Sequence, residues 1–188
     1  STIARRAEQL LLERGSVCYV LDGDNIRFGL NKDLGFSPAD RTENIRRVGE
    51  VARLFTDANI ITISAFISPY RKERDFARSL SADGDFLEVF IDCPVDVCEQ
   101  RDPKGMYKKA MAGEIQGFTG VNDPYEEPTN PELIIDTDQE SIEASADRVM
   151  QLLVDRGYVP AWDAVTPVTL ADRSEAAKRV EQAKKTPG

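Results

Sequence analysis

The residues best suited to chemistry follow the first apolar run of the chain. Residues 17–21 are apolar and rich in β-formers, which predicts a buried strand, and Asp22-Gly23-Asp24-Asn25-Ile26-Arg27 comes directly after it. In an open α/β sheet, ligands bind beyond the carboxyl ends of strands. Asp22 and Asp24 there suit a Mg²⁺ ion or a base for a hydroxyl, and Arg27 suits phosphate or sulfate. Asp-Gly and Asp-Asn pairs are also ordinary turn residues, so the segment alone leaves a plain turn open.

The composition restricts the class of protein. The chain has 188 residues, 41% of them apolar, which suits one domain with a sizeable core. Its net charge of -9 argues against nucleic acid or an anionic membrane as the main partner. The sequence contains no apolar run long enough to span a bilayer and no signal peptide. We therefore expect a cytoplasmic protein; an organelle stays open, because a transit peptide would lie upstream of Ser1.

The nucleophiles available to the protein are limited. Histidine is absent, which removes Ser–His and Cys–His mechanisms and histidine-bound zinc. Acid–base chemistry therefore falls to carboxylates, lysine or tyrosine. Cys18, Cys93 and Cys98 show no Cys-x-x-Cys spacing, so we interpret them as buried reduced thiols in a reducing compartment.

The order of the expected elements indicates the fold class. Periodicity and turn residues predict helix 1–14, strand 17–21, helix 38–58, strand 60–67, helix 70–80, strand 86–92, helix 94–101, strand 133–136 and a last helix, capped by Asp138, that ends at Gly157. Such alternation predicts an α/β fold, a parallel sheet with helices on both faces. Because a helix comes first, we expect the first strand to lie upstream of Ser1. Residues 1–159 form one domain, and residues 160–188 are a tail or linker, weakly helical or disordered.

Polar residues near helix starts are further candidates for binding an anion. Arg41 and Asn44 are three residues apart in the first turns of their predicted helix, so they share a face near its positive end. Ser68 lies at a strand-to-helix junction, where a plain N-cap before Pro69 and an anion contact are compatible interpretations.

A basic stretch and two loop aromatics complete the candidates. Residues 101–120 carry a local excess of Lys and Arg, which is typical of a lid over an anion or of a solvated helix. Phe118 lies between two glycines, and Phe36 lies in a loop rich in turn residues. Exposed loop aromatics suit stacking on a base, although a loop Phe also commonly anchors its loop on the core.

Several long segments, in the right order, resemble adenosine 5′-phosphosulfate (APS) kinase, the kinase domain of synthetases of 3′-phosphoadenosine 5′-phosphosulfate (PAPS). They are residues 22–27, 29–36, 41 with 43–47, 66–71, 98–102, 104–110 and 113–120. The resemblance implies a P-loop NTPase or kinase-like fold and transfer of the ATP γ-phosphoryl to the ribose 3′-hydroxyl of APS, which gives PAPS. It also implies that the first strand and most of the Walker A loop are absent from this chain and precede Ser1.

The resemblance assigns roles to individual residues. Asp24 is the implied catalytic base or Mg²⁺-organising carboxylate, Asp22 supports it, and Ser68 is a third catalytic candidate because some members phosphorylate this serine. The implied substrate-binding residues are Asp24, Asn25, Ile26, Arg27, Phe36, Arg41, Asn44, Ile67, Ser68, Lys104, Phe118 and Thr119. The implied ATP contacts are Ser1, Thr2 and Arg101, and the implied metal ligands are Ser1 and Asp24. Phe28 replaces the histidine that the family usually has, and we expect only a packing change there.

The resemblance also implies partners. These are Mg²⁺ with ATP as co-substrate, APS, a second copy in a homodimer, and an ATP sulfurylase that is fused or associated. An alternative is a non-catalytic regulatory domain that senses the nucleotide for a sulfurylase. Against this alternative, the Asp22 and Asp24 pair and the lid are what a kinase needs.

Overall fold

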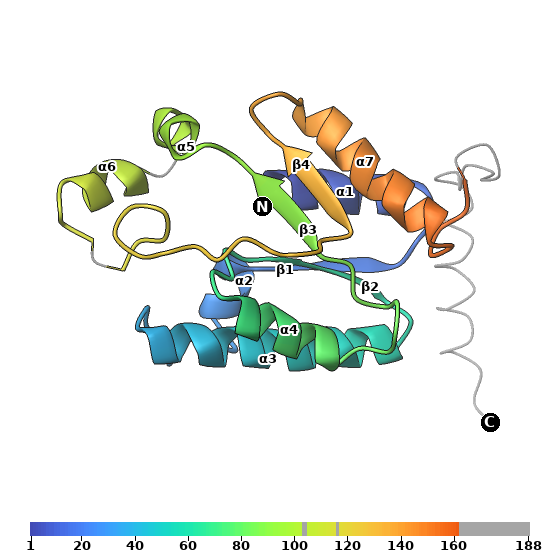
Figure 1. The fold of residues 1–188 in the computed structure, drawn as a ribbon. Helices are drawn as coiled ribbons and strands as arrows, with labels where there is room; N and C mark the ends of the chain where they lie inside the picture. The colour runs from blue at the N-terminus through green and yellow to red at the C-terminus, as the bar shows by residue number, and fades with distance from the viewer. Residues whose placement is uncertain (103–104, 116, 162–188) are drawn as a thin grey trace, which may run out of the picture.

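The computed structural model describes residues 1–102, 105–115 and 117–161, with Asp24 described through its backbone only. Helices and strands follow the predicted order along the chain, except that two short helices, α2 and α6, were not predicted as separate elements (Figure 1). They are α1 (Thr2–Glu13), β1 (Cys18–Asp22), α2 (Gly23–Arg27), α3 (Pro38–Asp57), β2 (Ile61–Ala65), α4 (Arg71–Ser79), β3 (Val89–Asp92), α5 (Val95–Arg101), α6 (Met106–Met111), β4 (Leu133–Asp136) and α7 (Ile142–Asp155). The predicted tail, residues 160–188, lies outside the described residues from position 162 onward.

The described strands form two parallel pairs. β1 pairs with β2, and β3 pairs with β4. The registers place Asp22 opposite Ala65 and Asp92 opposite Asp136, so the two strands of each pair end together. The prediction of parallel strands is therefore confirmed. Within the described residues, however, the predicted sheet is divided, because no strand joins the free edge of β2 to the free edge of β3.

Helices cover both faces of the strands. α3 and α4 lie along one side of β1 and β2, whereas α1 and α7 lie on the other side (Figure 1). The larger buried cluster joins α1 to α7 and comprises Leu10, Leu11, Ala146, Met150, Leu153 and Val159. A smaller cluster of Leu21, Ile26 and Val48 joins β1, α2 and α3, and this cluster fixes α2 at the end of β1.

Local sequence decides where two helices begin. Ser37 Oγ accepts from the Asp40 N–H at 3.2 Å and Asp40 Oδ2 accepts from the Ser37 N–H at 3.3 Å, which is a reciprocal capping box at the start of α3. This start agrees with the prediction. α7 begins after Ser141, whose Oγ accepts from the Ala144 N–H at 3.2 Å, so the predicted cap at Asp138 is wrong.

Two further predictions about helices need correction. Tyr70, not Ser68, is the N-cap of α4, and it makes no side-chain cap bond. Ser68 has a φ of 42°, in the left-handed region, so the chain turns sharply before the helix instead of capping it. On α7, Ile142, Ala146, Val149 and Leu153 are predicted to point inward. Ala146 and Leu153 are buried, but Ile142 is 44% exposed and Met150 is buried in its place, because the buried face follows the contact with α1.

β3 is shorter than predicted because side chains take over part of its hydrogen bonding. Arg78 Nη1 donates to the Phe86 carbonyl at 3.2 Å, and Glu132 Oε2 accepts from the Glu88 N–H at 2.6 Å. These bonds satisfy backbone groups that would otherwise need a neighbouring strand. β4, in contrast, has the predicted bounds.

Small residues set the distance between α3 and α4. A Cβ atom at Gly49 would lie 3.1 Å from Leu80 Cδ1 and 3.6 Å from Ala77 Cβ. A side chain at position 49 would therefore crowd this contact, and the Leu80 side chain would have to shift to make room for it.

The structure can be compared with two expectations that came from the composition. Cys18, Cys93 and Cys98 are free thiols, but they are half-buried and not fully buried as expected. Across the described ranges, no helix combines the length and the apolar character needed to cross a membrane.

Leu11 offers a test of the core between α1 and α7. Its side chain is fully buried, whereas the adjacent Leu12 is 45% exposed. We expect Leu11→Ala to lower the free energy of unfolding by about 2–5 kcal/mol because it leaves a cavity, and Leu12→Ala to lower it by less than about 1 kcal/mol. Urea unfolding followed by circular dichroism measures both values. Equal losses would contradict the described packing of α1.

Candidate active site

Asp22 is the buried carboxylate at the end of β1. The residue is 4% exposed, and Arg5 Nη2 donates to its Oδ2 at 3.0 Å. Its Oδ1 accepts from the Asn25 N–H at 3.1 Å, and its own N–H donates to Asn25 Oδ1 at 3.0 Å. Both oxygens therefore hold protein groups and organise the turn into α2. Asp24 lies two residues further on, within α2, and its side chain is outside the described part of the chain.

Arg5 is a site residue that the sequence did not reveal. Its N–H donates to the Ser1 carbonyl at 2.9 Å, and its guanidinium bonds Glu8 at 3.0 Å as well as Asp22. These carboxylates, Glu8 first, raise the pKa of Arg5. The contact brings the first turn of α1, with the predicted residues Ser1 and Thr2, to the Asp22 end of β1. The spacing of Arg5 and Glu8 is visible in the sequence, but the link to Asp22 depends on the fold.

Two predicted substrate contacts in α2 face the protein. Asn25 Nδ2 donates to the Val20 carbonyl at 2.7 Å. Ile26 is 7% exposed and packs with Leu21 and Val48. These side chains fix α2 on β1 and α3, so contact with a ligand falls to the backbone of the helix.

Arg27 and Phe36, two predicted substrate contacts, are neighbours. The Arg27 guanidinium carbon lies 4.2 Å from the centre of the Phe36 ring, and Nη1 donates to the carbonyls of Leu34 at 3.3 Å and Gly35 at 3.1 Å. Phe36 itself is 67% exposed. Arg27 therefore supports the loop that presents the aromatic ring to solvent.

Arg41 connects the two loops that carry the predicted aromatics. Its Nε donates to the Phe36 carbonyl at 3.1 Å, its Nη1 donates to Thr119 Oγ1 at 2.9 Å, and its Nη2 donates to the Gly117 carbonyl. Asp123 Oδ2 lies 4.0 Å from Nη1 and partly balances the charge. One guanidinium thus holds the backbone of Phe36 and the residues on both sides of Phe118. The structure brings together three residues that the sequence placed up to 83 positions apart.

Asn44, on the same face of α3 as Arg41, is 4% exposed. Its Oδ1 accepts from Asn31 Nδ2 at 2.9 Å, in a hydrogen bond that is buried. Asn31 is 0% exposed and was not among the predicted site residues, because it lies in a loop of turn residues with no periodic signal.

The segment after β2 reaches the same end of the sheet. Because Asp22 pairs with Ala65, α2 and residues 66–68 emerge side by side. Ile67 is 60% exposed, and the Ser68 carbonyl accepts from Arg74 Nη1 at 2.7 Å. Ser68 is half-buried and available for a hydroxyl contact, whereas Ile67 presents an apolar side chain to solvent.

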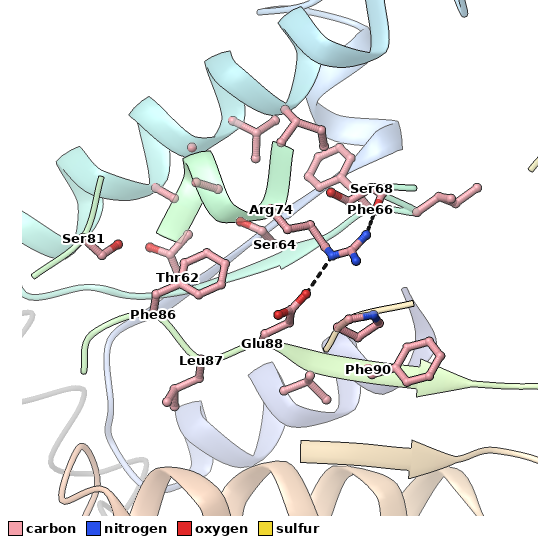
Figure 2. A pocket seen from close by; sticks show the side chains of 18 of the residues that line it. Thr62, Ser64, Phe66, Ser68, Arg74, Ser81, Phe86, Leu87, Glu88 and Phe90 are labelled. Carbon is pink, nitrogen blue, oxygen red and sulfur yellow. Dashed lines mark hydrogen bonds and ion pairs between the residues drawn. The ribbon is translucent and has the colours of Figure 1, made fainter. Parts of the chain in front are cut away.

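A groove separates the two strand pairs, and Ser68 lies at its edge. Its walls include Thr62, Ser64 and Phe66 from β2 and its continuation, and Phe86, Glu88 and Phe90 from the segment that includes β3. Figure 2 shows Arg74 reaching from α4 across the groove to Glu88, with Nε 2.7 Å from Oε1. The groove lies between the strand edges that have no partner.

The predicted lid residues lie on the other side of the crevice. Arg101 is exposed at the end of α5, and its Nη2 donates to the Thr137 carbonyl at 2.8 Å, which ties α5 to the end of β4. Phe118 packs edge-to-face on Tyr107 of α6 with ring centres 4.9 Å apart. Burial first, and then the Cys98 thiol, raise the pKa of Tyr107 to about 12. The prediction for Lys104 falls outside the described residues.

The fold and the crevice together are typical of a nucleotide-binding protein with parallel α/β structure. Carboxylates follow β1, guanidinium groups line the crevice, and aromatic rings lie on loops that one of these groups joins. All of them lie beyond the carboxyl ends of the strands, where this class of fold binds ligands.

Comparison with known proteins identifies the family. The family model for adenylylsulphate kinase matches residues 1–136. A probable adenylyl-sulfate kinase of Halalkalibacterium halodurans is 57% identical over 153 residues, which are 81% of this chain and 76% of that protein. The adenylyl-sulfate kinase of Staphylococcus carnosus is 54% identical over 159 residues, which are 85% of this chain and 80% of that protein.

Solved structures agree. The structure of the Mycobacterium tuberculosis APS kinase CysC in complex with AMPPNP and APS superposes with a TM-score of 0.77 at 51% identity, over 81% of this chain and 88% of that chain. The chain therefore belongs to the adenylyl-sulfate kinase family, and its class is that of a phosphoryl-transferring enzyme.

Tyr107 offers a test of how the lid packs on Phe118. Because burial favours the neutral phenol, we expect one tyrosine to titrate near pH 12 instead of near 10, and this group to be missing in Tyr107→Phe. Its contribution to stability is present below pH 10 and is lost as the pH rises through about 12. The ultraviolet absorbance of tyrosinate measures the titration. A normal titration of all tyrosines would mean that the ring is solvated.

Proposed function

We propose that the protein transfers the γ-phosphoryl group of ATP to the ribose 3′-hydroxyl of APS, which yields PAPS and ADP. The observation that carries this proposal is the position of Arg41, whose guanidinium holds the loops of Phe36 and Phe118 together, while Arg27 of α2 lies against the Phe36 ring. An anionic group attached to a purine nucleoside needs a cation flanked by aromatic faces, and this crevice has both. Residues 1–159 form the proposed catalytic domain.

Each predicted residue then has a chemical task. Phe36 and Phe118 stack on the adenine, while Arg27, Arg41 and Asn44 bind the phosphosulfate. Asp24 accepts the proton of the 3′-hydroxyl. The hydroxyl oxygen attacks the γ-phosphorus, and the bond between the γ-phosphorus and the oxygen that bridges to the β-phosphate breaks. Further contacts come from the backbone of Asn25 and Ile26, from Ile67, Ser68 and Thr119, and, on the family resemblance, from Lys104. Catalysis of this kind rests mainly on positioning and on the stabilisation of charge.

We propose that Asp24 and the Ser1 hydroxyl hold a Mg²⁺ ion, as the family resemblance implies. Asp22 plays a supporting part, because Arg5 and the Asn25 N–H already bond its two oxygens. Among the described residues, no three acidic or thiol side chains come together as a group that could hold a metal ion. When bound, Mg²⁺ would neutralise charge on the transferred phosphates.

We further infer that the groove between β2 and β3 receives an apolar strand from a segment upstream of Ser1, and that a phosphate-binding loop joins this strand to α1. Three features support the inference. Both flanking strands keep a free edge toward the groove, the lining is partly apolar, and Arg5 holds the start of α1 against the Asp22 end of β1. Such a loop would place ATP phosphates at the N-terminus of α1, where anions are favoured, with Thr2 and Arg101 nearby.

For assembly, we propose a homodimer in the cytoplasm, on the family resemblance. One structural neighbour is a hexameric APS kinase from Thiobacillus denitrificans, with a TM-score of 0.61 and 32% identity, and the match covers 27% of that chain. We also propose that an ATP sulfurylase is fused to this protein or associates with it. Light scattering of the purified protein distinguishes a dimer from a monomer or a hexamer.

The kinase proposal predicts a gain and a loss of activity. A protein extended upstream by an apolar strand and Gly-x-x-x-x-Gly-Lys should convert APS with ATP and Mg²⁺ at least about 100-fold faster than the chain as it stands, because the loop stabilises charge in the transition state. In the extended protein, Asp24→Asn should lower kcat by about 10²- to 10⁴-fold. Chromatography of PAPS and ADP measures both.

Asp57→Asn is the matched control, since Asp57 ends α3 away from the crevice and pairs only with Arg53 among the described residues. It should leave kcat unchanged. A folded, extended protein that binds PAPS but never turns over would refute the kinase proposal and favour the sensing domain.

A further inference from the structure

Asn31 has an environment that is unusual for a loop residue. Its side chain is 0% exposed, and its Nδ2 donates to Asn44 Oδ1 at 2.9 Å. Its backbone is also engaged, because the Asn31 N–H donates to the Ile26 carbonyl at 3.0 Å and the Leu34 N–H donates to the Asn31 carbonyl at 3.1 Å. The side chain is thus held rigidly against α3 by the loop that leads from α2 to Phe36.

The bond to Asn31 decides which way the Asn44 amide faces. A primary amide has an acceptor side and a donor side. With Oδ1 turned toward Asn31, the NH₂ group of Asn44 is the side left for another partner, and no other described residue accepts from it. The opposite orientation of the pair would turn Oδ1 outward, which would repel an anion.

The side-chain oxygen of Asn31 strengthens this view. This Oδ1 atom is buried and has no hydrogen-bond partner among the described residues. Leaving a buried amide oxygen unsatisfied costs stability. A serine or an apolar residue would avoid this loss, so an amide at this position points to a task for its NH₂ group.

We propose that Asn31 is a positioning residue, which orients the Asn44 amide so that its NH₂ group faces the phosphosulfate of APS beside Arg41. This inference rests on the proposed function, in which Asn44 binds that anion. Asn31 itself does not touch the substrate. It acts by making one amide orientation of Asn44 far more stable than the other.

The replacement Asn31→Asp inverts this preference. A carboxylate accepts where Asn31 donates, so Asn44 would turn its NH₂ group inward and present Oδ1 to the anion. The loss of one charge-assisted hydrogen bond corresponds to APS binding that is about 10- to 100-fold weaker. Adenosine lacks the anionic group, so its affinity should stay unchanged.

The experiment measures the Kd values of APS and adenosine by calorimetry, with competition for the weaker ligand, so no turnover is needed. Asn130→Asp makes the same chemical change at an exposed position and is the control. Because Asn31→Asp puts a charge into the core, Asn31→Ala is measured as well. It should weaken APS binding several-fold, again without an effect on adenosine, since Asn44 can then adopt both orientations.

A double-mutant cycle separates positioning from a merely structural role. In an Asn44→Ala background, Asn31→Asp should have no further effect on APS binding, because the group through which it acts is gone. Equal weakening of APS and adenosine, additive effects in the cycle, or unchanged APS binding by both Asn31 variants would overturn the proposal. If the unaltered chain binds adenosine but not APS, the proposed function itself fails, which is a separate result.

Discussion

The hydrogen bonds between β1 and β2 decide where the chemistry of this protein is located. Their parallel register sets Asp22 opposite Ala65, so α2 and the turn at residues 66–68 leave the pair at one edge. β3 and β4 repeat the arrangement, with Asp92 opposite Asp136, and Arg101 then ties α5 to the end of β4. Because backbone groups in a sheet must be paired, these registers resist a slip of even one residue. The strand registers therefore set the position of the crevice, and the loops then supply its side chains.

Within that crevice, the guanidinium groups are organised by the protein's own carbonyl groups. Arg27 bonds the carbonyls of Leu34 and Gly35, and Arg41 bonds those of Phe36 and Gly117. An anion that bound here would meet cations whose positions are already restricted, so the arginine side chains would lose less conformational entropy on binding. The neighbouring Asp123 limits the positive charge around Arg41 without making the short contact that would neutralise it.

Much of this arrangement follows from local sequence. The Ser37 and Asp40 spacing predicts the start of α3, and the apolar run at residues 133–136 predicts β4. The carboxylates, cations and aromatics of the site are also recognisable by type. The choice between two possible N-cap residues is less dependable. Asp138 comes first in the sequence, but Ser141 is the N-cap of α7, because the contact with α1 sets the position of that helix.

What the sequence could not show depends on contacts across long stretches of chain. Arg5 bonds Asp22 across 17 positions, and Arg41 bonds Gly117 across 76. Neither contact leaves a periodic trace. The buried Asn31 lies in a loop that reads only as turn residues, and the left-handed Ser68 has no local signal because Ser ordinarily avoids that conformation.

Gly49 has an effect at a distance from its own contacts. It lets α3 approach Leu80 and Ala77 beside α4, and Arg41 lies about 12 Å further along the same helix axis. Because α3 is rigid, a small tilt of its axis at Gly49 would displace Arg41 sideways by a larger distance. The position of the Arg41 guanidinium therefore depends partly on the absence of a side chain eight residues away, at Gly49.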